Sequence, residues 1–318
     1  MHITRRAALA AFAALPFAAW AQDRPIRLLV GFPAGGGTDA IARVLAEALQ
    51  ASLGQPVIVE NKPGAGGQLA AQALKAAAPD GMTLLVSHDH TISILPLVLK
   101  HQGFDPVRDF QPVAGFATFA NAIALSSGTP AASLTDYFAW VKTQGGQANV
   151  GIPAPASVPE FLVRLLGEKN GLNLQSVPYR GSAPMIADML GNQISAGVGS
   201  VPDLITQHQQ RKLRIVAVMG QQRQAMLPEV PTFAELGIAG FEELPYYGVF
   251  APAGTAPALI ARFANALAGV IAQPGVKARL AELGLSVGAM APAQLAARER
   301  AYAASWARII KAGGFQPQ

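Results

Sequence analysis

The order of strand-like and helix-like segments constrains the fold of this chain more than any other feature. Short apolar runs at 26–30, 57–60 and 83–87 alternate with helical stretches at 38–53 and 67–78. Alternation of this kind is typical of a parallel sheet with helices on both faces. Turn-forming sequences such as Gly54-Gln55-Pro56 and Pro79-Asp80-Gly81 separate the segments. The first part of the chain is therefore predicted to form an α/β unit.

A second α/β set and a third segment follow. The second set has strand-like runs at 148–152, 174–177, 194–198 and 213–218, with helices at 159–170 and 183–190. The third, with a strand at 248–251 and helices at 257–272 and 292–312, is better suited to complete the first unit than to form its own core. The chain then crosses between two lobes twice, near 120–125 and 246–251. We predict one domain at 22–121 plus 250–318 and a second at 122–249, with a ligand cleft between the lobes.

Four loops at strand ends are the candidate binding segments: 32–39, 87–91, 153–157 and 178–184. They contain few charged side chains and many Gly, Ala, Ser and Pro residues. A glycine-rich turn that leads into a helix offers free N–H groups and the positive end of the helix dipole, so an anion can bind there without a cationic side chain. On this view Gly36 and Gly37 matter because they lack side chains.

The first of these loops also allows another interpretation. Gly35-x-Gly37-x-x-Ala40 follows a strand and fits the dinucleotide-binding pattern, and Glu60 closes the next apolar run. The alternative function is therefore an exported nucleotide-dependent oxidoreductase that uses the Gly35–Gly37 loop. The loop begins with Pro33, however, and Glu60 runs into the turn Asn61-Lys62-Pro63-Gly64, which suggests a turn-bracing carboxylate.

The N-terminus predicts export. Arg5-Arg6 precede an apolar run at 7–19 and an Ala19-Trp20-Ala21 cleavage pattern. We expect removal of residues 1–21 and a periplasmic location, with general secretion and the twin-arginine route both open. The chain has no cysteine, which excludes disulfides and thiolate metal sites. A formal charge of +5 without a run of basic residues does not favour nucleic acid as a partner.

Individual polar side chains leave alternatives open. Asp39 either caps or braces its loop, or contacts the solute. Arg180 either clamps a carboxylate or points outward, and Tyr246 and Tyr247 either line the cleft or pack at the hinge. His88 and His90 form an H-x-H pair without an evident third ligand, so no metal is predicted. No catalytic residue and no cofactor are predicted either.

Several motifs together resemble the extracytoplasmic solute receptors of tripartite tricarboxylate transporters, called Bug receptors. The resemblance runs from about Pro25 to the C-terminus and rests on the segments 25–28, 32–39, 54–67, 78–81, 104–106, 177–184 and 250–255. It implies a periplasmic-binding-protein fold of the type II kind, with two α/β domains joined by two crossing strands. It also implies a monomer that binds a small carboxylate, and the membrane components of such a transporter as partners.

The resemblance, together with the strand-end loops, gives the predicted ligand-binding residues. These are Phe32, Pro33, Ala34, Gly35, Gly36, Gly37, Thr38, Asp39, Ser87, His88, Ala154, Ser157, Tyr179, Arg180, Gly181, Ser182 and Ala183. The chain departs from the family pattern at Glu160, where a histidine is common, and at Pro155, where a small residue is expected. A carboxylate beside the cleft would disfavour a second negative group on the solute, so binding of a dicarboxylate is in doubt.

Overall fold

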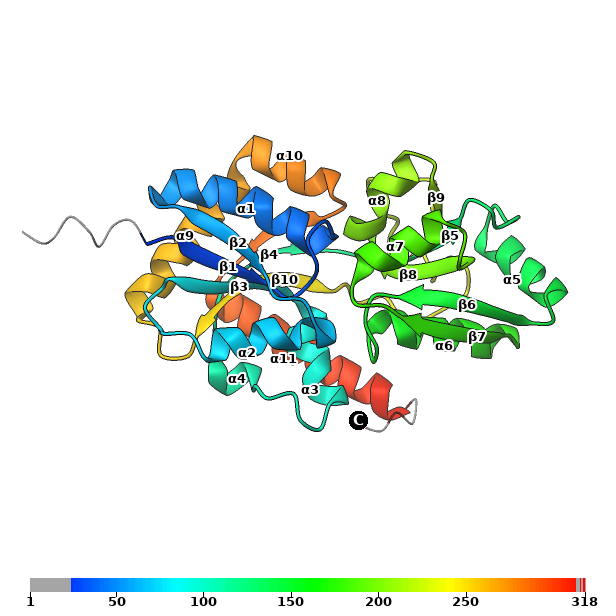
Figure 1. The fold of residues 1–318 in the computed structure, drawn as a ribbon, viewed down its shortest axis with the longest axis horizontal. Helices are drawn as coiled ribbons and strands as arrows, with labels where there is room; N and C mark the ends of the chain where they lie inside the picture. Colours follow the sequence, from blue (N-terminus) through cyan, green and yellow to red (C-terminus); the bar gives the residue numbers. More distant parts are fainter. Residues whose placement is uncertain (1–23, 313–314, 316, 318) are drawn as a thin grey trace, which may run out of the picture.

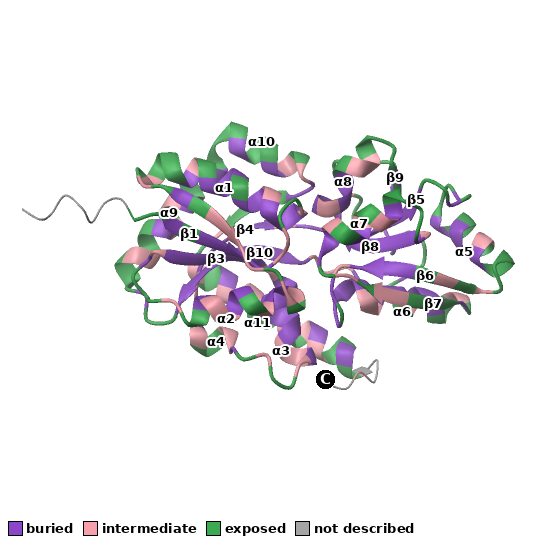
Figure 2. Cartoon of the chain, in the orientation of Figure 1, coloured by how far each residue is buried: buried purple, intermediate pink, exposed green. Residues whose placement is uncertain are grey.

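Two separate sheets divide the chain into two lobes, which lie side by side in the computed structural model (Figure 1). The description covers residues 24–312, 315 and 317, so the predicted leader at 1–21 lies outside the described residues. The first lobe contains the six-stranded sheet and the second lobe the five-stranded sheet. The central strands of both sheets are buried, and the outer helix faces are exposed (Figure 2).

The sheet of the first lobe is mixed. Its strand order is β11 (Ser286–Met290), β4 (Phe110–Thr118), β10 (Tyr246–Pro252), β3 (Thr83–His88), β1 (Ile26–Val30) and β2 (Val57–Asn61). β1 runs parallel to β2 and β3, whereas β10 runs antiparallel to both β3 and β4. A strand from the end of the chain thus sits between two strands from its beginning.

Helices cover both faces of this sheet, and for that reason its strands are apolar on both sides. Ile26, Leu28 and Val30 pack in one cluster, while Leu29 packs in the other. The helices of the first face are α1 (Gly37–Leu53), α9 (Pro257–Ala272) and α10 (Pro274–Glu282). The second face carries α2 (Gln68–Lys75), α3 (Leu95–Val98) and α11 (Pro292–Ala312). Short helical turns at Ala65–Gly67 and His90–Ile94 precede α2 and α3.

The second lobe has the strand order β7 (Asn173–Pro178), β6 (Gln147–Ile152), β8 (Ala196–Ser200), β5 (Asn121–Ser126) and β9 (Leu213–Val218). β6 is parallel to β7 and β8, and β5 is antiparallel to β8 and β9. Its helices are α5 (Leu134–Thr143), α6 (Val158–Asn170), α7 (Ser182–Leu190) and α8 (Val201–Gln209).

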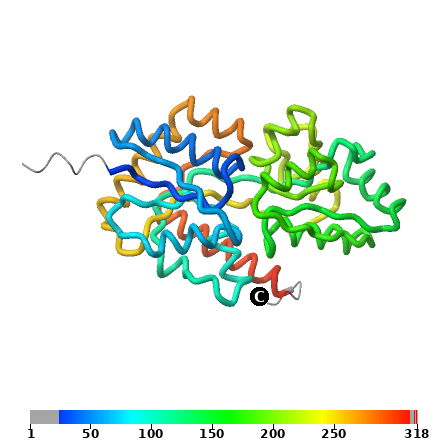
Figure 3. Tube along the Cα trace, in the orientation of Figure 1, coloured from blue at the N-terminus to red at the C-terminus, as the bar shows by residue number. Residues whose placement is uncertain are grey.

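The chain passes between the lobes twice, once from β4 to β5 and once on the way to β10 (Figure 3). The two passages lie side by side, because Phe119 N–H donates to the Pro245 carbonyl oxygen. The predicted domain boundaries need correction here. A boundary at 249/250 falls inside β10, whose ladder with β4 begins at Tyr246, and one at 121/122 falls inside β5. We propose boundaries at the passages themselves, near 119–120 and 245–246.

The last helix, α11, connects the lobes a third time. Its Tyr302 ring packs edge-on against Tyr246 of the first lobe. One turn later, Trp306 contacts the rings of Phe161 and Phe241 in the second lobe. The hinge therefore consists of two passages of the chain and one helix packed across them.

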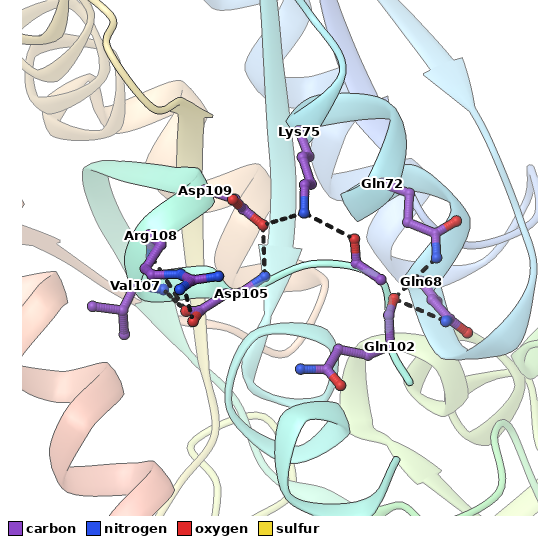
Figure 4. A network of polar contacts seen from close by, with 9 residues as sticks. Gln68, Gln72, Lys75, Gln102, Asp105, Val107, Arg108 and Asp109 are labelled. Atoms are coloured by element: carbon purple, nitrogen blue, oxygen red, sulfur yellow. Dashed lines mark hydrogen bonds and ion pairs between the residues drawn. The ribbon is translucent and has the colours of Figure 1, made fainter. Parts of the chain in front are cut away.

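A polar network holds the segment before β4 against α2 (Figure 4). Gln68 and Gln72 donate to the Gln102 carbonyl oxygen, both at 2.9 Å. Lys75 Nζ donates to the Gly103 carbonyl oxygen at 3.2 Å and pairs with Asp109 Oδ2 at 2.9 Å. These residues lie three or four positions apart, on one face of α2. The segment also contains the one-turn helix α4 (Pro106–Asp109), which Asp105 caps.

Most predicted elements are found within two or three residues of the predicted ends, and the helices at 257–272 and 292–312 match them. β4, β11, α3, α4, α5, α8 and α10 were not predicted. β4 contains Pro112 and Gly115, which interrupt the apolar pattern, and β11 is short and mostly exposed. In the part of the chain that the structure describes, no single helix is long and apolar enough to cross a membrane. α9 and α10, bent by 79°, meet the length and composition criteria only as a joined pair.

Candidate functional site

A cavity of about 50 Å³ lies between the two lobes. Its first-lobe wall comes from the loop after β1, the end of β3 and β10. Its second-lobe wall comes from the starts of α6, α7 and α8 and from Asn121. A single water needs about 10–15 Å³, so this cavity has room for a few waters or a small solute.

Four helices begin at the cavity, one from the first lobe and three from the second. The first-turn or N-cap residues that line it are Gly37 of α1, Ser157 of α6, Ser182 of α7 and Ser200 of α8. Each helix start carries about half a positive charge. At α8 the first N–H groups are already bonded, since Val201 N–H donates to the Ala120 carbonyl oxygen and Asp203 N–H to Ser200 Oγ. Among the described residues, no lysine or arginine lines the cavity. The positive potential there comes from the backbone.

The wall of the first lobe is aromatic. The His88 ring stacks on Phe32 with 4.9 Å between centroids and meets the edges of Phe119 and Tyr247 at 5.8 and 5.3 Å. Tyr247 also donates or accepts a hydrogen bond with Thr38 Oγ1 at 3.0 Å. Burial raises the pKa of the Tyr247 hydroxyl far above its usual value, so it stays neutral. This wall can pack against an apolar part of a solute.

Two carboxylates face the same cavity. Asp203, from the first turn of α8, accepts from Gly37 N–H of the opposite lobe at 2.7 Å and from the Ser200 hydroxyl at 2.6 Å. Asp89 contacts His88 Nδ1 at 3.2 Å and accepts from the Tyr302 hydroxyl at 3.0 Å. The protein therefore supplies negative charge to a cavity whose backbone is positive.

His90 is a buried titratable group in the cavity lining, at 6% exposure. Both ring nitrogens lack a hydrogen-bond partner among the described residues. Burial, followed by the neighbouring His88, lowers the pKa of His90 to about 4, so the ring is neutral at ordinary pH. A neutral imidazole has one donor and one acceptor, and neither is used here.

Nine predicted site residues line the cavity: Phe32, Pro33, Gly36, Gly37, Thr38, His88, Ala154, Ser157 and Ser182. The other eight do not: Ala34, Gly35, Asp39, Ser87, Tyr179, Arg180, Gly181 and Ala183. Ala34, Gly35 and Arg180 are exposed, whereas Ser87 is enclosed within β3. The Tyr179 hydroxyl donates to Asp188 at 2.6 Å, away from the cavity.

Gly181 has a structural role at the mouth of the cleft. Its φ is +105°, and a Cβ there would lie 2.6 Å from Pro33 Cδ of the first lobe. The lobes touch at this point, so a glycine is required both by the backbone and by the contact. Ala183 follows in the first turn of α7, outside the cavity lining.

Asp39 braces its own loop. It accepts from Gly35 N–H at 3.0 Å, from Arg43 Nε at 2.9 Å and from Asn61 Nδ2 at 2.9 Å. Burial alone would raise the pKa of Asp39, but these hydrogen bonds and the Arg43 charge hold it below its usual value. Of the two tyrosines, Tyr247 lines the cavity, whereas Tyr246 turns away and its hydroxyl lies 2.6 Å from Ser93 Oγ.

Glu160 does not supply the carboxylate beside the cleft that the sequence suggested. Its carboxylate accepts from Ala156 N–H, and the side chain does not line the cavity. Asp89 and Asp203 take that place. Sequence reasoning missed Ser200, Asp203, Asn121 and Phe119 as lining residues. Ser200-x-x-Asp203 is a helix-capping pattern, so a signal for the start of α8 was present.

The first loop is poorly arranged for a nucleotide. Asp39 and Asp203 accept from the N–H groups of Gly35 and Gly37, which a pyrophosphate would need. Glu60 pairs with Lys62 at 2.7 Å and with Arg27 at 3.4 Å, which makes it a brace at the end of β2. Among the described residues, no group of three side chains suited to a metal is found. The absence of a metal or cofactor stays a prediction.

Two α/β lobes that enclose a small cavity lined by helix N-termini define a two-lobed solute-binding protein. A family model described as "Tripartite tricarboxylate transporter family receptor" matches residues 41–315. The chain belongs to this family, which confirms the resemblance seen in the sequence. Its members are periplasmic solute-binding receptors and not enzymes, so the oxidoreductase alternative is wrong.

Individual relatives agree with this assignment. The chain is 34% identical over 290 residues to the Cupriavidus necator protein named "UPF0065 protein in gbd 5'region". The aligned residues cover 88% of this chain and 88% of that protein. The solved periplasmic binding protein BugD has a TM-score of 0.87 and 30% identity, covering 93% of this chain and 99% of its own. R. palustris Rpa4515, solved with adipate, has a TM-score of 0.88 and 27% identity, covering 94% of this chain and 100% of its own. These matches confirm the predicted two-domain periplasmic-binding-protein fold.

Proposed function

We propose that this chain is a periplasmic receptor that encloses a small organic carboxylate between its lobes and delivers it to the membrane components of a tripartite tricarboxylate-type transporter. The observation that carries the proposal is the cavity itself, because four helix N-termini meet in it and no lysine or arginine of the described residues lines it. Such an arrangement can hold a carboxylate through N–H groups and hydroxyls. The adipate complex of Rpa4515, a relative of the same fold, supports a carboxylate as the solute.

We include in the proposed site the nine predicted residues that line the cavity, together with Asn121, Ser200, Asp203 and Tyr247. We further propose that the receptor is a monomer, that it does not bind nucleic acid, and that residues 1–21 are removed on export. Intact-mass measurement of the exported protein tests the last point, because a mass that includes residues 1–21 would contradict it.

The test of binding is a thermal-shift screen of the exported protein against small organic acids, followed by calorimetry of those that raise the melting temperature. Ser182→Phe places a ring in the cavity and should abolish the shift, because Ser182 is buried and lines it. Ser127→Phe, at an exposed turn of the same lobe, is the matched control and should bind as the wild type does. Equal binding by both variants would place the site elsewhere.

Delivery needs a separate test. Uptake of the labelled solute into vesicles that carry the membrane components should require the receptor and should fail with Ser182→Phe. Uptake that is the same without the receptor would contradict the proposed delivery step.

A further inference from the structure

The α1 end of the cavity already holds a carboxylate, and it belongs to the protein. Asp203 reaches across the cleft from the second lobe, and its Oδ1 lies 2.7 Å from Gly37 N. The Ser200 hydroxyl fixes its other oxygen at 2.6 Å. This N–H group stands at the start of a 17-residue helix, where an anion from a solute would otherwise be expected. The first lobe therefore has its anion before any solute enters.

The charges around the cavity are close to balance without a solute. Asp89 and Asp203 contribute two negative charges, and the four helix starts contribute about half a positive charge each. With no lysine or arginine in the described lining, a solute with one carboxylate leaves a moderate excess of negative charge. A second carboxylate on the solute would lie near Asp203 or Asp89 without a cation to compensate it.

The second lobe has the free groups for one carboxylate. α6 and α7 both start at the cavity, and no hydrogen bond to the Ser182 hydroxyl is found among the described residues. His90 of the first lobe adds no such group, because both of its ring nitrogens are inaccessible and Nε2 lies beside Gly66. The aromatic wall around His88 also lines the cavity.

We propose that Asp203 makes the receptor select a solute with a single carboxylate, held by the second lobe, whose far end is uncharged or carries an ammonium or hydroxyl donor. The inference rests on the proposed function and specifies its solute class. Asp203 and Asp89 have acceptor positions left for such a donor, since a carboxylate can accept about four hydrogen bonds. A second carboxylate at that end meets repulsion where an ammonium meets attraction.

The test compares solutes that differ only at the far end. The first set is succinate, butyrate and 4-aminobutyrate, and the second is adipate, hexanoate and 6-aminohexanoate. Calorimetry on the exported protein should show the monocarboxylate and the amino acid of at least one set binding tenfold or more tighter than its dicarboxylate. Asp203→Asn keeps the size and removes the charge, so it should reduce this preference tenfold or more. Asp136→Asn, an exposed acid on α5 of the same lobe, is the control and should keep it.

The results separate the inference about Asp203 from the proposed function on which it rests. If the wild type shows this tenfold preference in neither set, or if Asp203→Asn keeps the preference of the wild type, the inference is overturned and the proposed function stands. If none of the six solutes binds, both are overturned for small carboxylates. Melting curves establish that each variant is folded before its affinities are compared.

Discussion

Gly37 is the position where a single methyl group should keep the lobes apart. A Cβ on Gly37 would lie 2.9 Å from Asp203 Oδ1, 3.0 Å from the Pro202 carbonyl carbon and 3.1 Å from Asp203 N. Two of these atoms are backbone of α8, in the opposite lobe, so they cannot turn aside as a flexible side chain would. The Gly37→Ala variant can relieve the contact only if α1 and α8 move apart.

The separation also weakens the hydrogen bond between Gly37 N–H and the Asp203 carboxylate, now 2.7 Å long. A hydrogen bond to a charged group contributes about 1.5–3 kcal/mol. If the closed form loses that much, affinity for a solute that binds only the closed form should fall by roughly 10–150-fold.

The neighbouring Gly36→Ala variant is the matched control. Its φ is −81°, and its nearest contacts would be Pro33 O at 3.4 Å and Asp203 Oδ1 at 3.8 Å, which are ordinary distances. The expectation that Gly36 and Gly37 are equally required is therefore replaced by a requirement at Gly37. Calorimetry with the best solute of the screen should show Gly36→Ala within about threefold of the wild type, a small change by the same conversion. Small-angle scattering should show that Gly37→Ala stays extended at saturation. Wild-type affinity in Gly37→Ala, or an equal loss in both variants, would refute the reasoning.

Four further predictions concern stability and the rim of the cleft. Because the pKa of His90 is lowered to about 4, against about 6.5 unfolded, stability should fall by on the order of 3 kcal/mol from pH 7 to pH 4, and urea unfolding of His90→Gln should show a smaller fall. Burial raises the pKa of Glu299 to about 7 from 4.5, so the protein loses stability as the pH rises from about 4.5 to 7 and this carboxyl group ionises. Glu299→Gln should be more stable than the wild type at pH 8, by up to about 3 kcal/mol, and equally stable at pH 4. Lys75→Ala should lower the free energy of unfolding by about 1 kcal/mol or less, because the side chain is 46% exposed. Asp109→Ala should lower it by about 1–2 kcal/mol, because the Asp105 N–H also loses its partner. A larger loss in Lys75→Ala than in Asp109→Ala would contradict this. Arg180→Ala should leave affinity within about twofold by calorimetry, a change of less than 0.5 kcal/mol, since Arg180 is exposed and outside the cavity lining.

The sequence was sufficient to predict the two lobes and the first-lobe side of the site. β1, α1 and the loop between them follow from local patterns, since an apolar run, glycines and an amphipathic stretch are contiguous in the chain. The partner of that loop could not be predicted, because Asp203 meets Gly37 only after two sheets have formed and the lobes have closed. A Ser-x-x-Asp pattern indicates the start of a helix, but it does not indicate which helix start faces the other lobe. The sequence left the direction of Arg180 open for the same reason, since that direction depends on how the segment before α7 sits on its sheet.

The place of β10 in the first sheet also sets an order in time. β10 separates β3 from β4, yet it is synthesised after the entire second lobe. At about 5–20 residues per second, the stretch from Thr118 to Tyr246 takes roughly 6–26 s to make. Throughout that interval β3 and β4 have no permanent neighbour at the edges that β10 will join. The second lobe, continuous from β5 to β9, can fold while the first waits, so a nascent chain of this protein remains partly unfolded until it is nearly complete. A chain with this topology is well suited to being threaded across a membrane before it folds.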